Sequence, residues 1–236
     1  MMPMSAELLR LAQAAFDLIF PRYCICCGQR LQPHERYLCV SCLLLMPRVP
    51  LAGFNPTAQA MVGWPVPVRA ASLYYYTQGS PYGHIVHRAK YQDQPEVAAH
   101  FARLLALELL PLGFFSGMQV VMPVPLASSR LRQRGYNQSL YIARAVAQVA
   151  QLPVRDDVIR RTAHHTTQTR LGRVERMRNM AQLFVVEGAE QVKGLHVLLV
   201  DDVITTGATI GSCAEALMQA GASEVSVLSL ALASGI

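Results

Sequence analysis

The chain has 236 residues, of which 52% are hydrophobic and 15% charged, and its formal net charge is +6. This length suits one core of ordinary size with a small appended module, and so high an apolar fraction excludes a disordered chain. The charge is uneven: residues 128–178 hold 11 arginines against three acidic residues, hence +8, while the rest of the chain has 10 basic and 12 acidic residues, hence −2. Such a local excess indicates an anionic partner at one place on the protein.

The first twenty residues are expected to form an amphipathic helix that packs on its own protein. Apolar side chains recur there at helical spacing, among them Leu8, Leu11, Phe16 and Ile19. Charged residues interrupt this segment, which also lacks the pattern of an export signal. The most apolar long stretch, residues 101–115, is too short to cross a bilayer. We therefore expect a cytoplasmic protein without stable membrane insertion.

Five of the six cysteines lie close together, as two Cys-x2-Cys pairs separated by eleven residues, with one surplus member at Cys26. This spacing predicts that two hairpin knuckles deliver four thiolates to one Zn²⁺. The expected ligands are Cys24, Cys27, Cys39 and Cys42. The ion would be structural, because four protein ligands leave no position for a reacting water. A cluster of free buried thiols is the alternative, and Cys26 is either a bystander or a substitute ligand.

After a proline-rich stretch at 47–70, which we expect to be an irregular connector, apolar runs alternate with helical patterns. The expected strands are 70–76, 119–122, 196–200 and 224–230, and the expected helices are near 94–110, 138–150 and 210–220. Strands that are continuous apolar runs separated by helices are typical of a parallel sheet covered on both faces. The pattern therefore predicts an α/β fold.

Residues 196–210 form the most informative stretch: an apolar run, two adjacent carboxylates, a loop of threonine and glycine, and a helical pattern. Ligands bind beyond the carboxyl ends of parallel strands, where we expect Asp201 and Asp202 to emerge. The loop that follows would present N–H groups and hydroxyls to a phosphate. Its members are Thr205, Thr206, Gly207, Ala208 and Thr209. The acids would then bind vicinal hydroxyls or Mg²⁺ beside that phosphate, which describes a ribose 5-phosphate site; an ordinary strand–turn–helix is the alternative.

Residues 200–209, Val-Asp-Asp-Val-Ile-Thr-Thr-Gly-Ala-Thr, resemble the phosphoribosyl pyrophosphate signature of type I phosphoribosyltransferases. A narrower resemblance, to the ComF/GntX family, covers residues 20–232. It rests on the cysteine pairs, His-Arg-Ala-Lys-Tyr at 87–91, Met-Pro-Val-Pro-Leu at 122–126, Arg-Leu-Arg-Gln-Arg-Gly-Tyr-Asn-Gln at 130–138, Thr-Gln-Thr at 167–169, Leu171 and Arg-Met-Arg-Asn at 176–179. Some members are required for natural transformation, in which imported single-stranded DNA is handled in the cytoplasm.

The resemblance implies a type I phosphoribosyltransferase-like parallel sheet flanked by helices over 71–236 and a small zinc-ribbon module over 21–46. The N-terminal helix would occupy 1–20 and the connector 47–70. The implied ligand is phosphoribosyl pyrophosphate with Mg²⁺, and Zn²⁺ is the implied structural metal. A polar loop at 166–179 would close over the substrate and exclude water.

The resemblance also implies roles for single residues. Asp201 and Asp202 would hold the ribose hydroxyls and, with Arg134, count as catalytic, since the leaving pyrophosphate needs positive charge. The residues expected to contact the ligand besides the acids and the loop are Pro123, Val124, Arg132, Arg176 and Lys90. Arginine suits this task because its planar group grips phosphate oxygens in pairs.

Two rival functions stay open. A non-enzymatic competence factor would use the basic segment to track single-stranded DNA. A nucleobase-salvage phosphoribosyltransferase would take its acceptor under a hood built by the zinc module and the connector. The DNA-uptake machinery and a second copy of the chain are further partner classes compatible with the resemblance.

Overall fold

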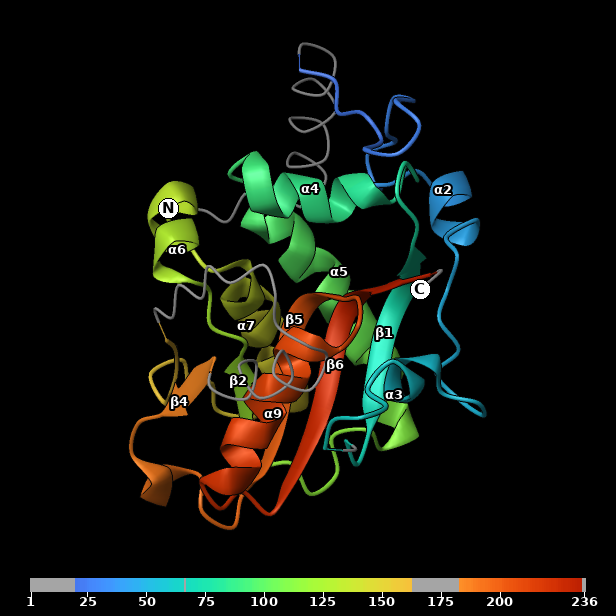
Figure 1. The fold of residues 1–236 in the computed structure, drawn as a ribbon. Helices are drawn as coiled ribbons and strands as arrows, with labels where there is room; N and C mark the ends of the chain where they lie inside the picture. Colours follow the sequence, from blue (N-terminus) through green and yellow to red (C-terminus); the bar gives the residue numbers. More distant parts are fainter. Residues whose placement is uncertain (1–19, 66, 163–182, 235–236) are drawn as a thin grey trace, which may run out of the picture.

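The computed structural model describes residues 20–65, 67–162 and 183–234, and its centre is a parallel sheet (Figure 1). Within these ranges, four strands form the sheet in the order β1-β6-β5-β2. They are β1 (Ala70–Tyr76), β2 (Val120–Pro123), β5 (His196–Ile204) and β6 (Glu224–Ala233). All three neighbouring pairs run parallel, which confirms the predicted α/β class.

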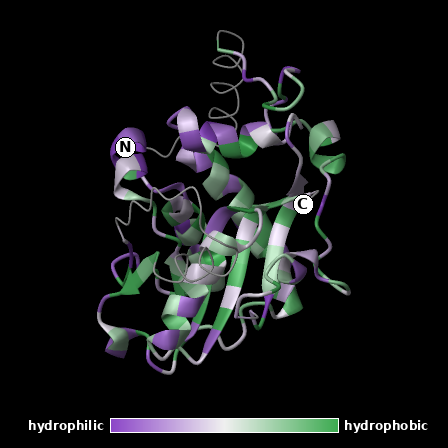
Figure 2. Ribbon diagram, viewed as in Figure 1, coloured by the Kyte–Doolittle hydropathy of each residue, from purple (hydrophilic) through white to green (hydrophobic). Residues whose placement is uncertain are grey.

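Helices cover both faces of the sheet, so that strands β5 and β6 are buried on either side. One face packs against α5 (Pro95–Leu109) and α7 (Gln138–Ala150), and the other against α9 (Ala208–Gln219). Figure 2 shows hydrophobic colouring along the strands and hydrophilic colouring gathered on α6 (Ser128–Arg134).

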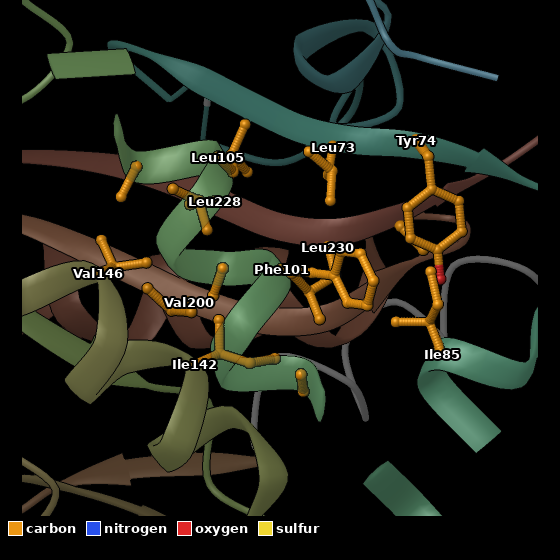
Figure 3. Packing of buried hydrophobic residues seen from close by; sticks show 14 of the residues in the cluster. Leu73, Tyr74, Ile85, Phe101, Leu105, Ile142, Val146, Val200, Leu228 and Leu230 are labelled. Atoms are coloured by element: carbon orange, nitrogen blue, oxygen red, sulfur yellow. The ribbon is translucent and has the colours of Figure 1, made fainter. Parts of the chain in front are cut away.

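Aliphatic and aromatic side chains fill the space between the sheet and the helices α5 and α7 (Figure 3). Phe101 and Leu105 of α5 and Ile142 of α7 meet Leu73 and Val200 of the strands, all with at most 1% of their surface exposed. Burial of such side chains contributes about 1.5–3 kcal/mol each. On the other face, Cys213 is fully buried in α9, which makes it a packing residue.

The expected strands and helices are present, with differences at their ends. The strand expected at 196–200 continues to Ile204, because its pairing with β6 extends through Asp201 opposite Ser229 to Ile204 opposite Leu232. Asp201 and Asp202 therefore lie inside the last part of the strand and do not emerge beyond it. The connector is not wholly irregular, since Asn55 caps the short helix α3 (Pro56–Gln59).

Several elements of the structure were not foreseen. The short elements are α2 (Val40–Leu44), α4 (Gly83–Tyr91), α6, the 3₁₀ turns η1 (Leu110–Leu112) and η2 (Ala189–Gln191), and the antiparallel pair of β3 (Ile159–Arg161) with β4 (Phe184–Val186). Of these, α4 and α6 lie near the carboxyl ends of the sheet strands (Figure 1).

Within the described ranges, every helix falls short of the length and apolar character that crossing a bilayer requires. The amphipathic helix expected at 1–20 falls on residues 1–19, which lie outside the described part of the chain.

Candidate functional site

The four cysteines predicted as ligands come together near the N-terminus. One sulfur from each lies within 4.8 Å of the other three, a group consisting of Cys24, Cys27, Cys39 and Cys42. Cys26 faces elsewhere, because its thiol donates to the carbonyl of Pro81 at 3.4 Å. The donor set is therefore the two Cys-x2-Cys pairs, and four thiolates are the chemistry that a structural zinc ion takes.

The two pairs reach this cluster by different local structures. The first lies in a turn where the N–H of Gly28, at φ +73°, donates to the carbonyl of Cys24 at 2.9 Å. The second was expected in a hairpin but opens the helix α2, because Cys39 occupies the N-cap position and its sulfur accepts from the N–H of Cys42 at 3.5 Å. Burial opposes ionisation of Cys24, yet hydrogen bonds from the backbone of neighbouring cysteines outweigh it and lower its pKa to about 7. Burial and hydrogen bonds with the neighbouring cysteines raise the pKa of Cys42, so that without a metal ion the cluster favours one thiolate, at Cys24.

A second candidate site is a cavity of about 350 Å³ at the carboxyl ends of the strands. It brings together predicted residues from four elements: Lys90 of α4, Arg134 of α6, Asp201 and Asp202 of β5, and Thr209 of α9. Val124 and Thr205 line it as well. Of the residues that the structure describes, four cationic side chains (Lys90, Arg130, Arg134 and Arg161) and two carboxylates line the cavity.

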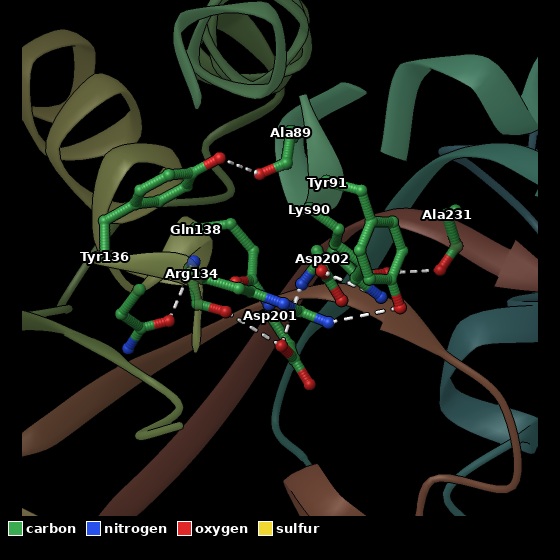
Figure 4. A network of polar contacts seen from close by, with 12 residues as sticks. Ala89, Lys90, Tyr91, Arg134, Tyr136, Gln138, Asp201, Asp202 and Ala231 are labelled. Carbon is green, nitrogen blue, oxygen red and sulfur yellow. Dashed lines mark hydrogen bonds and ion pairs between the residues drawn. The ribbon is translucent and has the colours of Figure 1, made fainter. Parts of the chain in front are cut away.

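The two carboxylates of β5 have different surroundings (Figure 4). Oδ1 of Asp201 accepts from the hydroxyl of Ser139 and from the N–H of Asp202, each at 2.9 Å. Asp202 is buried, with Oδ2 at 3.0 Å from Nζ of Lys90. Burial and the adjacent charge of Asp202 raise the pKa of Asp201 to about 7, and the two hydrogen bonds and Lys90 only partly offset them. The carboxyl of Asp201 thus takes up a proton near neutral pH.

The loop predicted to bind phosphate follows β5 and leads into α9. Thr205 and Thr206 are exposed, and Gly207 stands at the N-cap of α9 with φ +69°. A Cβ at 207 would lie 2.5 Å from the carbonyl oxygen of Ala60, so that only glycine fits there. Among the described residues no side chain caps this twelve-residue helix, and its first N–H groups are suited to an anion beside Thr209.

The arginines of α6 divide between the cavity and the surface. Arg130 and Arg134, one helical turn apart, line the cavity, whereas Arg132 is exposed and does not. Arg130 lies four residues before Arg134, which places both on one face of a helix, and this spacing is the sequence signal that identifies Arg130 as a cavity residue. Arg161 lines the cavity from β3, and nothing in its local sequence marks it.

Arg134 is oriented by contacts on both sides. It donates to Gln138 at 3.1 Å and to the hydroxyl of Tyr91 at 3.3 Å, and its guanidinium carbon lies 4.9 Å from the centre of the Tyr91 ring (Figure 4). Arg176 and the loop predicted at 166–179 lie outside the described residues.

The segment after β2 reaches the cavity through its pairing with β5. Pro123 lies opposite Val200, and the next N–H, that of Val124, donates to the carbonyl of Val200 at 2.9 Å. The side-chain amide of Asn137 holds this segment by donating to the carbonyl of Val124 at 3.0 Å. The predicted pyrophosphate loop therefore starts beside Asp201.

The zinc module and the connector, which are expected to form a hood over the acceptor, lie outside the described lining of this cavity. Among the described residues, the cavity lining begins at Tyr76, so that neither the zinc module nor the connector contributes to it. Helix α4 borders the cavity instead, and the zinc module supports that helix: the hydroxyl of Tyr82, at the N-cap of α4, donates to the carbonyl of Cys42 at 2.8 Å.

A serine–histidine–glutamate set lies at the opposite ends of the strands. The ring of His196 contacts Ser226 Oγ at 2.9 Å through Nε2 and Glu224 at 2.9 Å through Nδ1. Ser226 is fully buried and its oxygen accepts from the N–H of Arg69 at 3.1 Å. A substrate cannot reach this serine, and the set is a structural hydrogen-bond chain.

Residues 137–234 match the family model described as "Phosphoribosyl transferase domain". This match and the observed sheet show the type I phosphoribosyltransferase fold, with the four-cysteine cluster near the N-terminus. The chain is 36% identical over 162 residues to the DNA utilization protein YhgH of Salmonella typhimurium, covering 67% of this chain and 70% of that protein. It is 28% identical over 218 residues to Competence protein F of Haemophilus influenzae, covering 91% of this chain and 86% of that protein. Among solved structures, the glutamine phosphoribosylpyrophosphate amidotransferase from B. subtilis aligns at 22% identity over 55% of this chain and 25% of that one, with a TM-score of 0.40.

Proposed function

This chain belongs to the ComF/GntX family, and on that premise we propose that its cavity binds phosphoribosyl pyrophosphate together with Mg²⁺. One observation carries the proposal: two carboxylates and the N-terminal end of a helix border the same cavity, and four cationic side chains line it. Hydroxyls donate to carboxylates, whereas phosphates accept from N–H groups and guanidinium groups. A sugar with free hydroxyls and anionic groups at two ends matches this arrangement.

In the proposed complex, Asp201 and Asp202 hold the 2- and 3-hydroxyls of the ribose. The loop at 205–209 and the first N–H groups of α9 hold the 5-phosphate. Arg130 and Arg134 face the pyrophosphate, and Lys90 lies beside Asp202. If the phosphoribosyl group is transferred, the bond from C1 to pyrophosphate breaks as the bond to the acceptor forms, and these cations stabilise the charge that the leaving group takes away.

The described cavity offers Mg²⁺ the carboxylates of Asp201 and Asp202 as oxygen ligands. Buried Oδ2 of Asp202 lies 3.0 Å from the ammonium of Lys90 and has no other polar partner among the described residues, so that this position favours a positive charge. Bound Mg²⁺ would add positive charge next to the pyrophosphate.

We place this activity in DNA uptake, with imported single-stranded DNA as the material acted on, because two relatives are named for DNA utilization and competence. A binding role without transfer is the second candidate. Arg132 and Arg144 support it, since both are exposed outside the cavity within the basic segment. The binding role differs from the transfer role in its salt dependence. Phosphate contacts along several nucleotides make the affinity for single-stranded DNA fall steeply with salt.

The test of ligand binding is isothermal calorimetry with phosphoribosyl pyrophosphate and Mg²⁺. We expect the Asp201→Asn/Asp202→Asn variant to lose measurable binding while its circular dichroism stays that of the wild type. Asp156→Asn/Asp157→Asn is the matched control, because it removes the same two charges from an exposed acid pair outside the cavity. Equal affinity of the wild type and the Asp201/Asp202 variant would refute the proposal.

A pyrophosphate-release assay across single-stranded DNA and free bases decides between the remaining functions. Release with DNA supports transfer to it, and release with a base supports salvage. Binding of DNA without release, unaffected by phosphoribosyl pyrophosphate, supports the binding role.

A further inference from the structure

Lys90 lies where a ligand hydroxyl or a metal ion would otherwise meet Asp202. Its ammonium is 3.0 Å from Oδ2 of Asp202, and the side chains are 21% and 7% exposed. Apart from this ion pair, that oxygen has no polar partner among the described residues, so that the charge of Lys90 is what compensates its burial. Removal of Lys90 would leave a buried carboxylate without its positive neighbour.

The position of Lys90 is held by its helix. It lies in the last turn of α4, where a cation is favoured by the helix dipole. The carbonyl of the preceding residue, Ala89, accepts from the hydroxyl of Tyr136 at 2.8 Å. Lys90 also lines a second, smaller cavity of about 250 Å³, together with Tyr91 and Arg134. Lys90 is thus held between the carboxylate of Asp202 and the two cavities that it lines.

We infer that Lys90 is a built-in positioning cation: it neutralises Asp202 in the free protein and, from the same place, donates to an anionic oxygen of the ligand, so that ribose 5-phosphate binds without divalent metal. This inference rests on the proposed function. An ammonium has three donors, of which one suffices for Asp202. A divalent ion between a carboxylate and a phosphate oxygen stabilises both by its positive charge, and the ammonium of Lys90 can do the same. The need for Mg²⁺ is then confined to ligands that also carry pyrophosphate.

The test uses ribose 5-phosphate as the probe, titrated with and without Mg²⁺ into the zinc-loaded full chain. We expect the wild type to bind about equally in both conditions. Lys90→Met should lose about tenfold to a hundredfold in affinity without Mg²⁺ and regain most of it when Mg²⁺ is added, because one charge-assisted contact is lost and then replaced. Lys90→Arg should retain most of the affinity. Lys193→Met is the matched control, since it removes the only other lysine, which is exposed and lies outside the cavity.

Three results would overturn the inference: a wild type that needs Mg²⁺ for ribose 5-phosphate, a Lys90→Met variant that binds as the wild type does, or a loss that Mg²⁺ does not repair. A cycle of Lys90→Met and Asp202→Asn, measured by urea unfolding without ligand, tests the pairing separately. If the two substitutions have additive effects on the free energy of unfolding, the pairing is overturned even if phosphoribosyl pyrophosphate binds. A coupled pair in a protein that binds neither sugar phosphate overturns the proposed function and the ligand half of this inference, and leaves the pairing supported.

Discussion

Replacing Asp201 by asparagine is expected to stabilise the free protein above pH 7. The amide oxygen of asparagine can accept the same two hydrogen bonds, from Ser139 and from the N–H of Asp202. What the substitution removes is the negative charge, which burial and the charge of Asp202 make unfavourable. The variant should therefore gain stability while it loses an acid proposed to bind ligand.

The size and the pH window follow from the pKa of Asp201, raised from an ordinary 3.8 to about 7. Between these values the folded protein holds a proton that the unfolded chain has lost, so that wild-type stability falls as pH rises. A difference of this size corresponds to about 4 kcal/mol, and we expect about 2–4 kcal/mol because the folded site relaxes around the charge. The advantage of the variant grows up to pH 7 and is constant above it.

Urea unfolding of the zinc-loaded wild type and variant, from about pH 5 to about pH 8, measures this advantage. Asp157→Asn is the control: its pKa is lowered by the Arg155 hydrogen bond, so that its effect should not vary over this range. A stability difference between Asp201→Asn and the wild type that is independent of pH would show that the charge of Asp201 is not unfavourable in the fold.

Two further predictions concern the cysteine cluster and the phosphate loop. Metal analysis should find about one zinc ion per chain in the wild type and in Cys26→Ser, but much less in Cys39→Ser; equal loss in both serine variants would contradict the four-cysteine set. Gly207→Ala should lower the free energy of unfolding by about 1–3 kcal/mol, since a Cβ at φ +69° would lie 2.5 Å from the carbonyl oxygen of Ala60. An unchanged midpoint of urea unfolding for Gly207→Ala would show that the backbone at Ala60 shifts away from the added Cβ at no cost in stability.

The sheet and its large helices were predictable because their signals are local. The apolar run 70–76 and the helical pattern 138–150 coincide with β1 and α7, down to Asn137 as the cap of α7. Helix α4 escaped prediction because it is short and begins without a side-chain cap. The end of β5 was placed too early because Asp201 and Asp202 are poor strand formers, and pairing with β6 overrides that preference.

The composition of the cavity was predictable only in part. Asp201, Asp202 and the loop at 205–209 are contiguous in the sequence. Their proximity can therefore be predicted without knowledge of the tertiary structure. Arg161 reaches the cavity from β3, whose pairing with β4 joins residues far apart in the chain. The pairing of Lys90 with Asp202 depends on how α4 lies across the strand ends, which no pattern within 87–91 reveals.

The contact between Gly207 and Ala60 separates two kinds of constraint. At 207 the demand falls on the side chain, because any Cβ would meet a carbonyl oxygen. At Ala60 this contact constrains only the path of the backbone, since every residue type supplies a carbonyl. The connector can therefore hold the loop at 205–209 through its backbone at Ala60, whereas its buried neighbours Thr57 and Met61 are constrained by their side chains. This accounts for a segment without a readable motif lying against the most readable motif in the chain.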